Sequence, residues 1–118
     1  MITLYDFQLS APCYAVRLFL ALLDLPHHLH PLDIYPGAEH HAPWFRALSP
    51  FGRVPVLADG EVVLADPIAI LVYLATRHDP GGPWYPTGSA DRLGEITEWL
   101  SLARELDATA GLARRALS

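Results

Sequence analysis

The chain has 118 residues, of which 52% are hydrophobic and 18% charged, and its formal net charge is −5. This length and apolar content predict about one folded domain and exclude a mainly disordered chain. The single cysteine excludes an internal disulfide and favours a reducing, cytoplasmic location. All eight basic residues are arginines scattered along an acidic chain, so we expect no nucleic-acid partner.

The sequence shows neither a targeting segment nor a membrane span. Residues 1–6 carry no basic region ahead of an apolar run, which is not typical of a secretory signal. The longest uninterrupted apolar stretch, residues 68–75, is far shorter than the roughly 20 residues that a membrane-spanning helix needs. We therefore expect a soluble protein that does not use a membrane as a partner.

The first predicted elements are a strand and a helix. Residues 2–7 mix β-branched and aromatic types and predict a short buried strand that ends before the helix-starting residues 10–12 (SAP). Pro12 suits the first turn of a helix. Residues 13–24 then predict an amphipathic helix against a sheet, because apolar residues recur at helical spacing. These residues are Val16, Phe19, Leu20 and Leu23.

The middle of the chain predicts three strands and a short helix. Residues 29–34 fit a second strand, and residues 43–48 a short helix after a turn-rich segment. Residues 54–58 and 61–64 form the clearest hairpin signal, because the Asp59-Gly60 pair between them supplies the positive φ angles of a tight turn. Two antiparallel strands follow from this pattern.

A third helix is predicted to start at Asp66-Pro67, with Asp66 as its N-cap and Pro67 in its first position. The helix is apolar almost all round through Ala75, so we expect it to be buried. Residues 79–83 are dense in helix breakers. One long helix is then predicted at 90–118, with an apolar stripe that needs a partner. The stripe consists of Leu93, Ile96, Leu100, Ala103, Leu106, Ala110 and Ala113.

Pro55 lies inside a strand-like run, where a proline removes one hydrogen bond of the sheet. A trans proline on an edge strand is one explanation. The other is a cis Val54–Pro55 bond, which turns the backbone groups of Val54 out of the sheet. Those groups could then hold an extended peptide ligand by strand addition.

Four segments taken together resemble the glutathione S-transferase family: residues 10–17 (SAPCYAVR), 48–57 (LSPFGRVPVL), 69–74 (AILVYL) and 84–86 (WYP). The resemblance is greatest to theta-like or zeta-like bacterial members with a serine in the active-site loop. It implies an α/β fold, in which a thioredoxin-like βαβαββα domain is followed by one long α-helix. The glutathione-binding domain would cover residues 1–79, with a linker at 80–89. Residues 90–118 would form the first helix of an incomplete all-α C-terminal domain.

The resemblance implies that Ser10 is catalytic, because in the family a hydroxyl or thiol at this place donates a hydrogen bond to the sulfur of glutathione. The sulfur is then held as thiolate, the nucleophilic form. A serine that only caps a helix is the alternative. Cys13, about one turn further on, is a second catalytic candidate through a mixed disulfide with glutathione. A small buried core residue is the other explanation for this cysteine.

The same resemblance implies the binding residues for glutathione. Val54, before Pro55, would pair its backbone with the cysteinyl part, and Arg53 and His40 would contact the glycine end. Arg53 could instead be a solvated surface charge. Asp66 stands where the family usually has a glutamate or glutamine, but the serine that normally follows is replaced by Pro67. The proline supplies neither the hydroxyl nor the N–H that hold the γ-glutamyl carboxylate, so Asp66 could be only a helix cap.

The histidines suggest a metal site only weakly. His28 and His30 would share one face of a strand, and His40 and His41 follow in a loop. No cysteine or carboxylate completes a recognisable ligand spacing, so we expect surface histidines and no metal.

Two classes of function follow from the resemblance. The first is an enzyme that conjugates or thiolyses an unknown electrophile with glutathione as co-substrate, activated by Ser10, in a cytoplasmic homodimer. Its activity would be weakened by Pro67 and by the truncated helical domain. The second is a non-catalytic dimerisation or binding module of the same fold. A thiol reductase that depends on Cys13 is a further alternative.

Overall fold

The structure of the protein is a computed structural model that describes residues 1–117, with side chains for residues 1–106 and 108. The chain divides into two compact units, Met1–Leu74 and Ala75–Ser118. The strands of the first unit are β1 (Ile2–Asp6), β2 (His27–Pro31), β3 (Val56–Asp59) and β4 (Val62–Leu64). The helices of the chain are α1 (Ala11–Leu22), the 3-10 helix η1 (Glu39–His41), α2 (Pro43–Leu48), α3 (Pro67–His78) and α4 (Ala90–Leu117).

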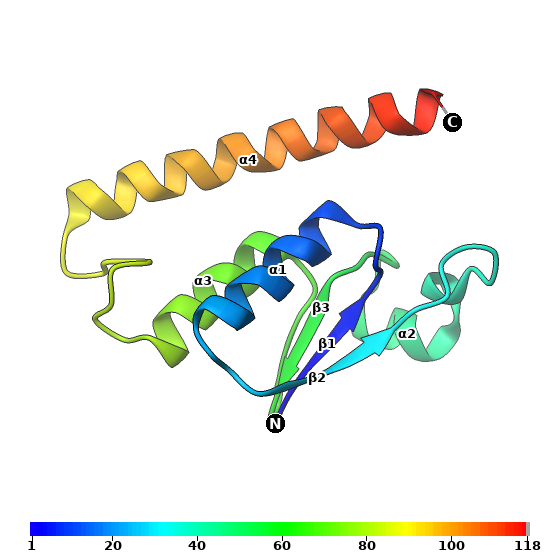
Figure 1. Ribbon diagram of the computed structural model, residues 1–118, viewed down its shortest axis with the longest axis horizontal. Helices are drawn as coiled ribbons and strands as arrows, with labels where there is room; N and C mark the ends of the chain where they lie inside the picture. Colours follow the sequence, from blue (N-terminus) through cyan, green and yellow to red (C-terminus); the bar gives the residue numbers. More distant parts are fainter. Residues whose placement is uncertain (118) are drawn as a thin grey trace. The chain divides into compact units, whose positions relative to one another are not determined.

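The first unit is built on a mixed sheet with strand order β2-β1-β3-β4. β1 and β2 run in the same direction, whereas β3 runs against β1 (Figure 1). β4 pairs with β3 in the antiparallel direction. A parallel pair needs a crossover connection, and α1 supplies it between β1 and β2. Gly60 takes a positive φ of 62° in the turn between β3 and β4. The predicted hairpin is present, but its turn is Gly60-Glu61 and not Asp59-Gly60, because Asp59 is the last residue of β3 and pairs with Val62 of β4.

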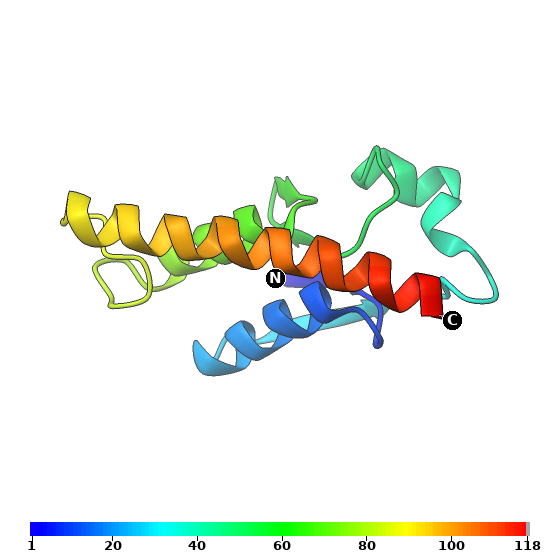
Figure 2. The same ribbon diagram turned by 90° about the horizontal axis from the view of Figure 1, so that it is seen from above.

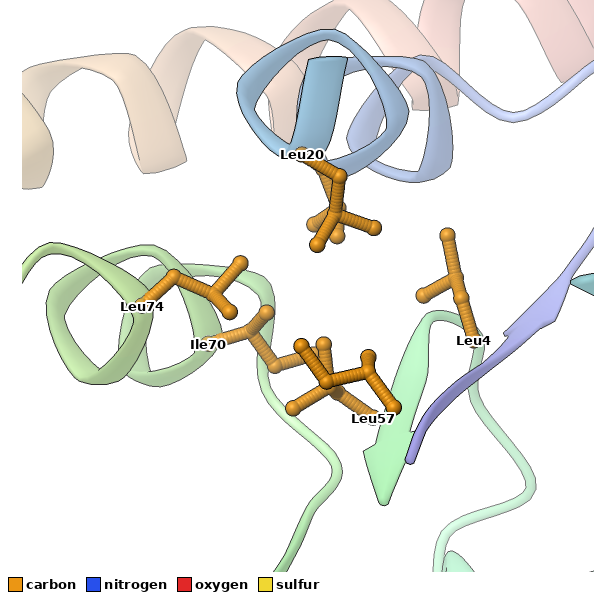
Figure 3. Close-up of a cluster of buried hydrophobic side chains, with 7 residues drawn as sticks. Leu4, Leu20, Leu57, Ile70 and Leu74 are labelled. Carbon is orange, nitrogen blue, oxygen red and sulfur yellow. The ribbon is translucent and has the colours of Figure 1, made fainter. Parts of the chain in front are cut away.

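The larger hydrophobic core lies between one face of the sheet and the helices α1 and α3. Leu4 of β1 and Leu57 of β3 point to this face. Leu20 of α1 meets Ile70 and Leu74 of α3 there (Figure 3), and all five side chains are fully buried. The two helices lie side by side when the molecule is seen from above (Figure 2). Burial of this set is the main apolar contribution to the stability of the unit.

A smaller core covers the opposite face of the sheet, beneath α2. Strand residues alternate in direction, so Tyr5 and Val56, the neighbours of Leu4 and Leu57, point away from the larger core. Phe45 of α2 is fully buried against Val56, and its ring centroid lies 6.2 Å from that of Tyr5. The fold therefore has three layers, with α1 and α3 on one face and α2 on the other.

The predicted α/β class and thioredoxin-like order of elements are confirmed by the observed order of strands and helices. The second strand differs, because it lies at His27–Pro31 rather than at 29–34. Its pairing with β1 starts at His27 and ends at Pro31, after which Leu32 enters the smaller core. The first helix ends at Leu22, since Asp24 takes a left-handed φ of 54°.

The long C-terminal helix is confirmed as α4, at Ala90–Leu117. Leu93, Ile96 and Leu100 of the predicted stripe are half-buried, whereas Ala103 and Leu106 are exposed; Ala110 and Ala113 lie outside the described side chains. None of the helices in the described part of the chain combines the length and the apolar character needed to cross a membrane. A domain boundary in the linker 80–89 stays a prediction.

We predict that Leu57→Ala lowers the free energy of unfolding by about 2 to 5 kcal/mol, because it leaves a cavity in the larger core. Urea denaturation followed by circular dichroism measures this change. Val63→Ala is the control, since Val63 is 42% exposed on β4, and we expect a change below about 1 kcal/mol. Equal effects of the two substitutions would contradict the assignment of the core.

Candidate functional site

All segments that carry predicted site residues meet the sheet at one edge. β1 and β2 are parallel, so both end at this edge, and the loops that follow them lead to Ser10 and His40. β3 runs the opposite way and starts at this edge, directly after Val54 and Pro55. β4 ends there, shortly before Asp66. The topology therefore gathers residues that are far apart in the sequence.

Ser10 is the N-cap of α1. Its backbone is extended, and its Oγ accepts a hydrogen bond from the backbone N–H of Cys13 at 3.3 Å. Its carbonyl oxygen accepts from the N–H of Tyr14 at 3.0 Å. A serine hydroxyl has a donor proton as well as acceptor lone pairs, so Ser10 can cap the helix and also donate to a ligand atom. The positive end of the helix dipole favours a negative atom at this place.

An ion pair connects the end of β1 to α1. The guanidinium of Arg17 donates through Nη1 to Oδ1 of Asp6, and through Nη2 to the carbonyl oxygen of Gln8 at 3.4 Å. The side chains are 8% exposed for Asp6 and 22% for Arg17, so solvent screens the pair only in part. Arg17 therefore fixes the segment that leads from β1 to Ser10.

Cys13 lies at the start of α1, but its side chain is fully buried. Burial raises the pKa of its thiol above the ordinary value of 9.0, because the thiolate would lose its hydration. Hydrogen bonds with Ser10 and with the backbone of Phe7 lower the pKa, but they offset only part of the effect of burial. A thiol kept neutral and away from solvent is a poor nucleophile.

Ser49 closes the turn that precedes Val54. This serine is 1% exposed, and its Oγ donates to the carbonyl oxygen of Arg53 at 2.9 Å and accepts from the N–H of Arg53 at 3.0 Å. The N–H of Gly52 donates to the Ser49 carbonyl oxygen at 2.8 Å, and Gly52 has a φ of 64°. The positive φ suits glycine, and the serine holds the backbone of Arg53 through both of its polar groups.

Val54 lies between this turn and β3. The Val54–Pro55 peptide bond is cis, and Pro55 is buried. Neither the N–H nor the carbonyl oxygen of Val54 has a hydrogen-bond partner within residues 1–117, which the structure describes. An extended ligand can therefore pair with the backbone of Val54 as an added strand would.

His40 of η1 has a buried Nδ1 atom without a hydrogen-bond partner among the described residues. Its ring centroid lies 3.9 Å from that of His41. Burial lowers the pKa of His40 below its ordinary value of 6.5, and the charges of His41 and Arg46 lower it further. The imidazole is therefore neutral at neutral pH.

Arg53 is exposed, and its guanidinium carbon lies 5.6 Å from the centroid of the Phe51 ring. No acidic side chain pairs with Arg53 in the described part of the chain. Its charge is thus available to an anionic group at the same edge of the sheet.

Asp66 caps α3. Its Oδ2 accepts a hydrogen bond from the N–H of Ala69 at 2.9 Å, and its carbonyl oxygen accepts from the N–H of Ile70 at 2.9 Å. This agrees with the N-cap that the sequence predicts. Pro67, at the first helical position, has no N–H to offer a ligand.

The histidines of β2 do not form a metal centre with their neighbours. No group of three or more His, Cys, Asp or Glu side chains that could hold a metal ion is found in the described residues. His28 is exposed, and the ring of His30 packs between Tyr5 and Trp44, with centroid separations of 5.0 and 5.3 Å. A separate open cavity of about 610 Å³ contains none of the predicted site residues. It is lined by Asp33, Gly37, Ala38, Glu39, His41, Ala42 and Trp44.

Two residues that shape this edge, Ser49 and Arg17, were not predicted from the sequence as parts of the site. Ser49 stands before a proline and three residues before a glycine, a turn pattern that could have indicated its role. Arg17 belongs to the polar face of its helix, and its pairing with Asp6 depends on the packing of α1 on the sheet.

Comparison with known proteins places this geometry in a family. The family model described as "Glutathione S-transferase, N-terminal domain" matches residues 10–77. The chain belongs to the glutathione S-transferase family. The match begins at Ser10 and includes the Arg53–Pro55 segment and the start of α3. It therefore covers the sheet edge where the predicted residues meet.

Curated glutathione S-transferases and solved structures agree with this assignment. The chain is 34% identical to glutathione S-transferase theta-1 of Bos taurus, over 81% of the chain and 40% of that protein. It is 41% identical to glutathione S-transferase 1 of Dianthus caryophyllus, over 70% of the chain and 37% of that protein. A possible glutathione S-transferase from Rhodopseudomonas palustris has a similar structure, with 35% identity and a TM-score of 0.81. That match covers 95% of this chain and 56% of the other.

Human glutathione transferase theta-2, solved in complex with glutathione and an unknown ligand, has a TM-score of 0.80 at 27% identity. The match covers 89% of this chain and 42% of the human protein. The chain thus spans about two fifths of the length of the curated theta-class relatives that it matches.

We predict that Arg17→Met lowers the free energy of unfolding by about 2 to 3 kcal/mol, because it leaves the buried carboxylate of Asp6 without its partner. Chemical denaturation at neutral pH measures the change. Arg77→Met, at an exposed arginine of α3, is the matched control and should change stability by less than about 0.5 kcal/mol. A loss no greater than that of the control would show that the pair does not stabilise the fold.

We predict that the Cys13 thiol reacts slowly with iodoacetamide in the folded protein. Its raised pKa and full burial leave little accessible thiolate at pH 7 to 8. Mass spectrometry follows the alkylation, and labelling in denaturant gives the rate of the free thiol. We expect labelling at least about 100-fold slower in the folded protein, which corresponds to an opening free energy of about 3 kcal/mol. Equal rates in the two states would contradict the buried position.

Proposed function

We propose that the chain is the glutathione-binding part of a glutathione transferase that uses Ser10 to activate the sulfur of glutathione. The proposal rests on the position of the Ser10 hydroxyl at the N-terminus of α1. Arg53 and the unpaired backbone of Val54 lie at the same edge of the sheet. A thiolate needs donors and positive potential around it, and this position offers both. The structure of human theta-2 with bound glutathione supports glutathione as the ligand.

In the proposed reaction, Ser10 donates a hydrogen bond to the sulfur of glutathione and lowers the pKa of that thiol. The released proton goes to solvent. The thiolate then forms a bond to an electrophilic atom of the second substrate, whose leaving group departs with the bonding electrons or whose double bond accepts them.

The rest of the glutathione molecule would lie along the same edge. The backbone of Val54 pairs with the cysteinyl residue, and His40 and Arg53 face the glycyl carboxylate. A neutral His40 contributes a hydrogen bond, and Arg53 contributes charge without an acidic competitor among the described residues.

At the γ-glutamyl end, the chain offers a ligand fewer polar contacts. Asp66 is engaged in capping α3, and Pro67 lacks the N–H and hydroxyl that a serine would supply. One lost charge-assisted hydrogen bond weakens binding by about 10- to 100-fold. We therefore expect glutathione to bind more weakly than it would with a serine in place of Pro67.

The same observation at Pro67 supports the second candidate, a non-catalytic binding or dimerisation module. A reductase that uses Cys13 is less favoured, because the thiol is buried and its pKa is raised. Homodimerisation and a cytoplasmic location are further proposals that follow from the family. Isothermal titration of glutathione distinguishes the enzyme from the module, since no heat of binding up to about 10 mM would contradict the enzyme.

We predict that Ser10→Ala lowers kcat/KM for conjugation of glutathione to 1-chloro-2,4-dinitrobenzene by about 10- to 100-fold, the value of one hydrogen bond to a charged atom. The pKa of bound glutathione, taken from the pH profile of kcat/KM, should rise towards that of the free thiol. Ser10→Thr keeps both the hydroxyl and the helix cap and should retain most activity. Unchanged activity of a folded Ser10→Ala protein would exclude Ser10 as the activating residue.

A further inference from the structure

Arg46 of α2 contacts the turn that precedes Val54 from its solvent side. Its Nε donates a hydrogen bond to the carbonyl oxygen of Pro50 at 2.9 Å. Its side chain also passes over Gly52: a Cβ atom at Gly52 would lie 3.3 Å from Cδ of Arg46 and 2.9 Å from the carbonyl oxygen of His40. Gly52 is therefore enclosed between η1 and Arg46.

The turn is held from two sides by side chains of different kinds. Ser49 is buried and forms hydrogen bonds with the backbone of Arg53 on the inner side of the turn. Arg46 is exposed and donates a hydrogen bond to the Pro50 carbonyl oxygen on the solvent side. Arg46 has no acidic partner among the described residues, so its guanidinium is committed to this carbonyl alone.

Arg46 also acts on His40. The groups whose charges affect this imidazole are His41 from η1 and Arg46 from α2, and both disfavour its protonation in addition to the effect of burial. Because Arg46 bonds the turn and its charge acts on His40, one side chain influences both segments that face the glycine end of the proposed site.

We propose that Arg46 is a positioning residue for the glycine end of bound glutathione, where it holds the Pro50–Arg53 turn against α2. The inference rests on the proposed function for its ligand, but the contacts of Arg46 with the turn are independent of it. Arg46 acts through Arg53 and His40, so its loss should weaken binding of glutathione and leave the activation of its sulfur by Ser10 unchanged.

Two substitutions separate the hydrogen bond from the charge. Arg46→Met removes both, whereas Arg46→Lys keeps the positive charge but lacks the Nε–H that binds the Pro50 carbonyl. We expect the dissociation constant and KM for glutathione to rise by about 3- to 10-fold in both variants, the value of one exposed hydrogen bond. We expect kcat at saturating glutathione to change by less than twofold. Arg92→Met, at an exposed arginine of α4, should match the wild-type protein.

Two further measurements do not need glutathione. In an NMR titration, the pKa of His40 should rise in Arg46→Met, because a repelling charge is removed, and should stay near the wild-type value in Arg46→Lys. Hydrogen exchange of the Gly52 amide should be at least threefold faster in both variants, because the turn that contains its bond to Ser49 is released.

The outcomes distinguish this inference from the proposed function. If the wild-type protein binds no glutathione, the proposed function fails, and the exchange of Gly52 alone decides whether Arg46 holds the turn. If the wild-type protein binds glutathione and Arg46→Met binds it equally well, the positioning role is overturned. An equal decrease in kcat in both variants would also overturn it, because Arg46 would then act on the reacting sulfur.

Discussion

The pairing of β1 with β2 in parallel and with β3 in the antiparallel direction is the constraint on which the rest of the first unit depends. A parallel partner forces the chain to return through α1, and this helix brings an N-terminus to the edge where β1 ends. An antiparallel partner on the other side makes β3 begin at that same edge. The topology thus places the N-terminus of α1 next to the unpaired backbone of Val54, which precedes β3. This placement does not depend on any particular ligand contact.

Two small polar clusters stabilise this edge at the points where the sheet gives no hydrogen bonds. Arg17 pairs with the buried carboxylate of Asp6 and orders the segment before Ser10. Ser49 satisfies both polar backbone groups of Arg53 and orders the segment before Val54. Irregular backbone is the part of a fold that hydrophobic burial positions least well, so side-chain hydrogen bonds determine its shape here.

The sequence predicted those features that depend on local chemistry. The hairpin around Gly60, the Asp66 cap and the helix start at Ser10 each follow from the conformational preferences of a few residues, and the structure contains all three. The hairpin turn lies one residue later than predicted, at Gly60-Glu61, because the pairing of Asp59 with Val62 sets it. The strand at His27–Pro31 was placed two residues too late, because three histidines carry little strand preference and its position is set by pairing with β1. Arg46 was missed for a similar reason, since its contacts with Pro50 and Gly52 are visible only after α2 packs beside the turn.

The burial of Cys13 bears on how the protein would tolerate electrophiles under the proposed function. Electrophiles that react with the sulfur of glutathione also alkylate exposed protein thiols and amines. The chain contains no lysine, and its only thiol is fully buried and held in the neutral form. In a glutathione transferase, an electrophile at this edge of the sheet would therefore react mainly with the sulfur of bound glutathione. The protein would be spared inactivation by self-modification at that site.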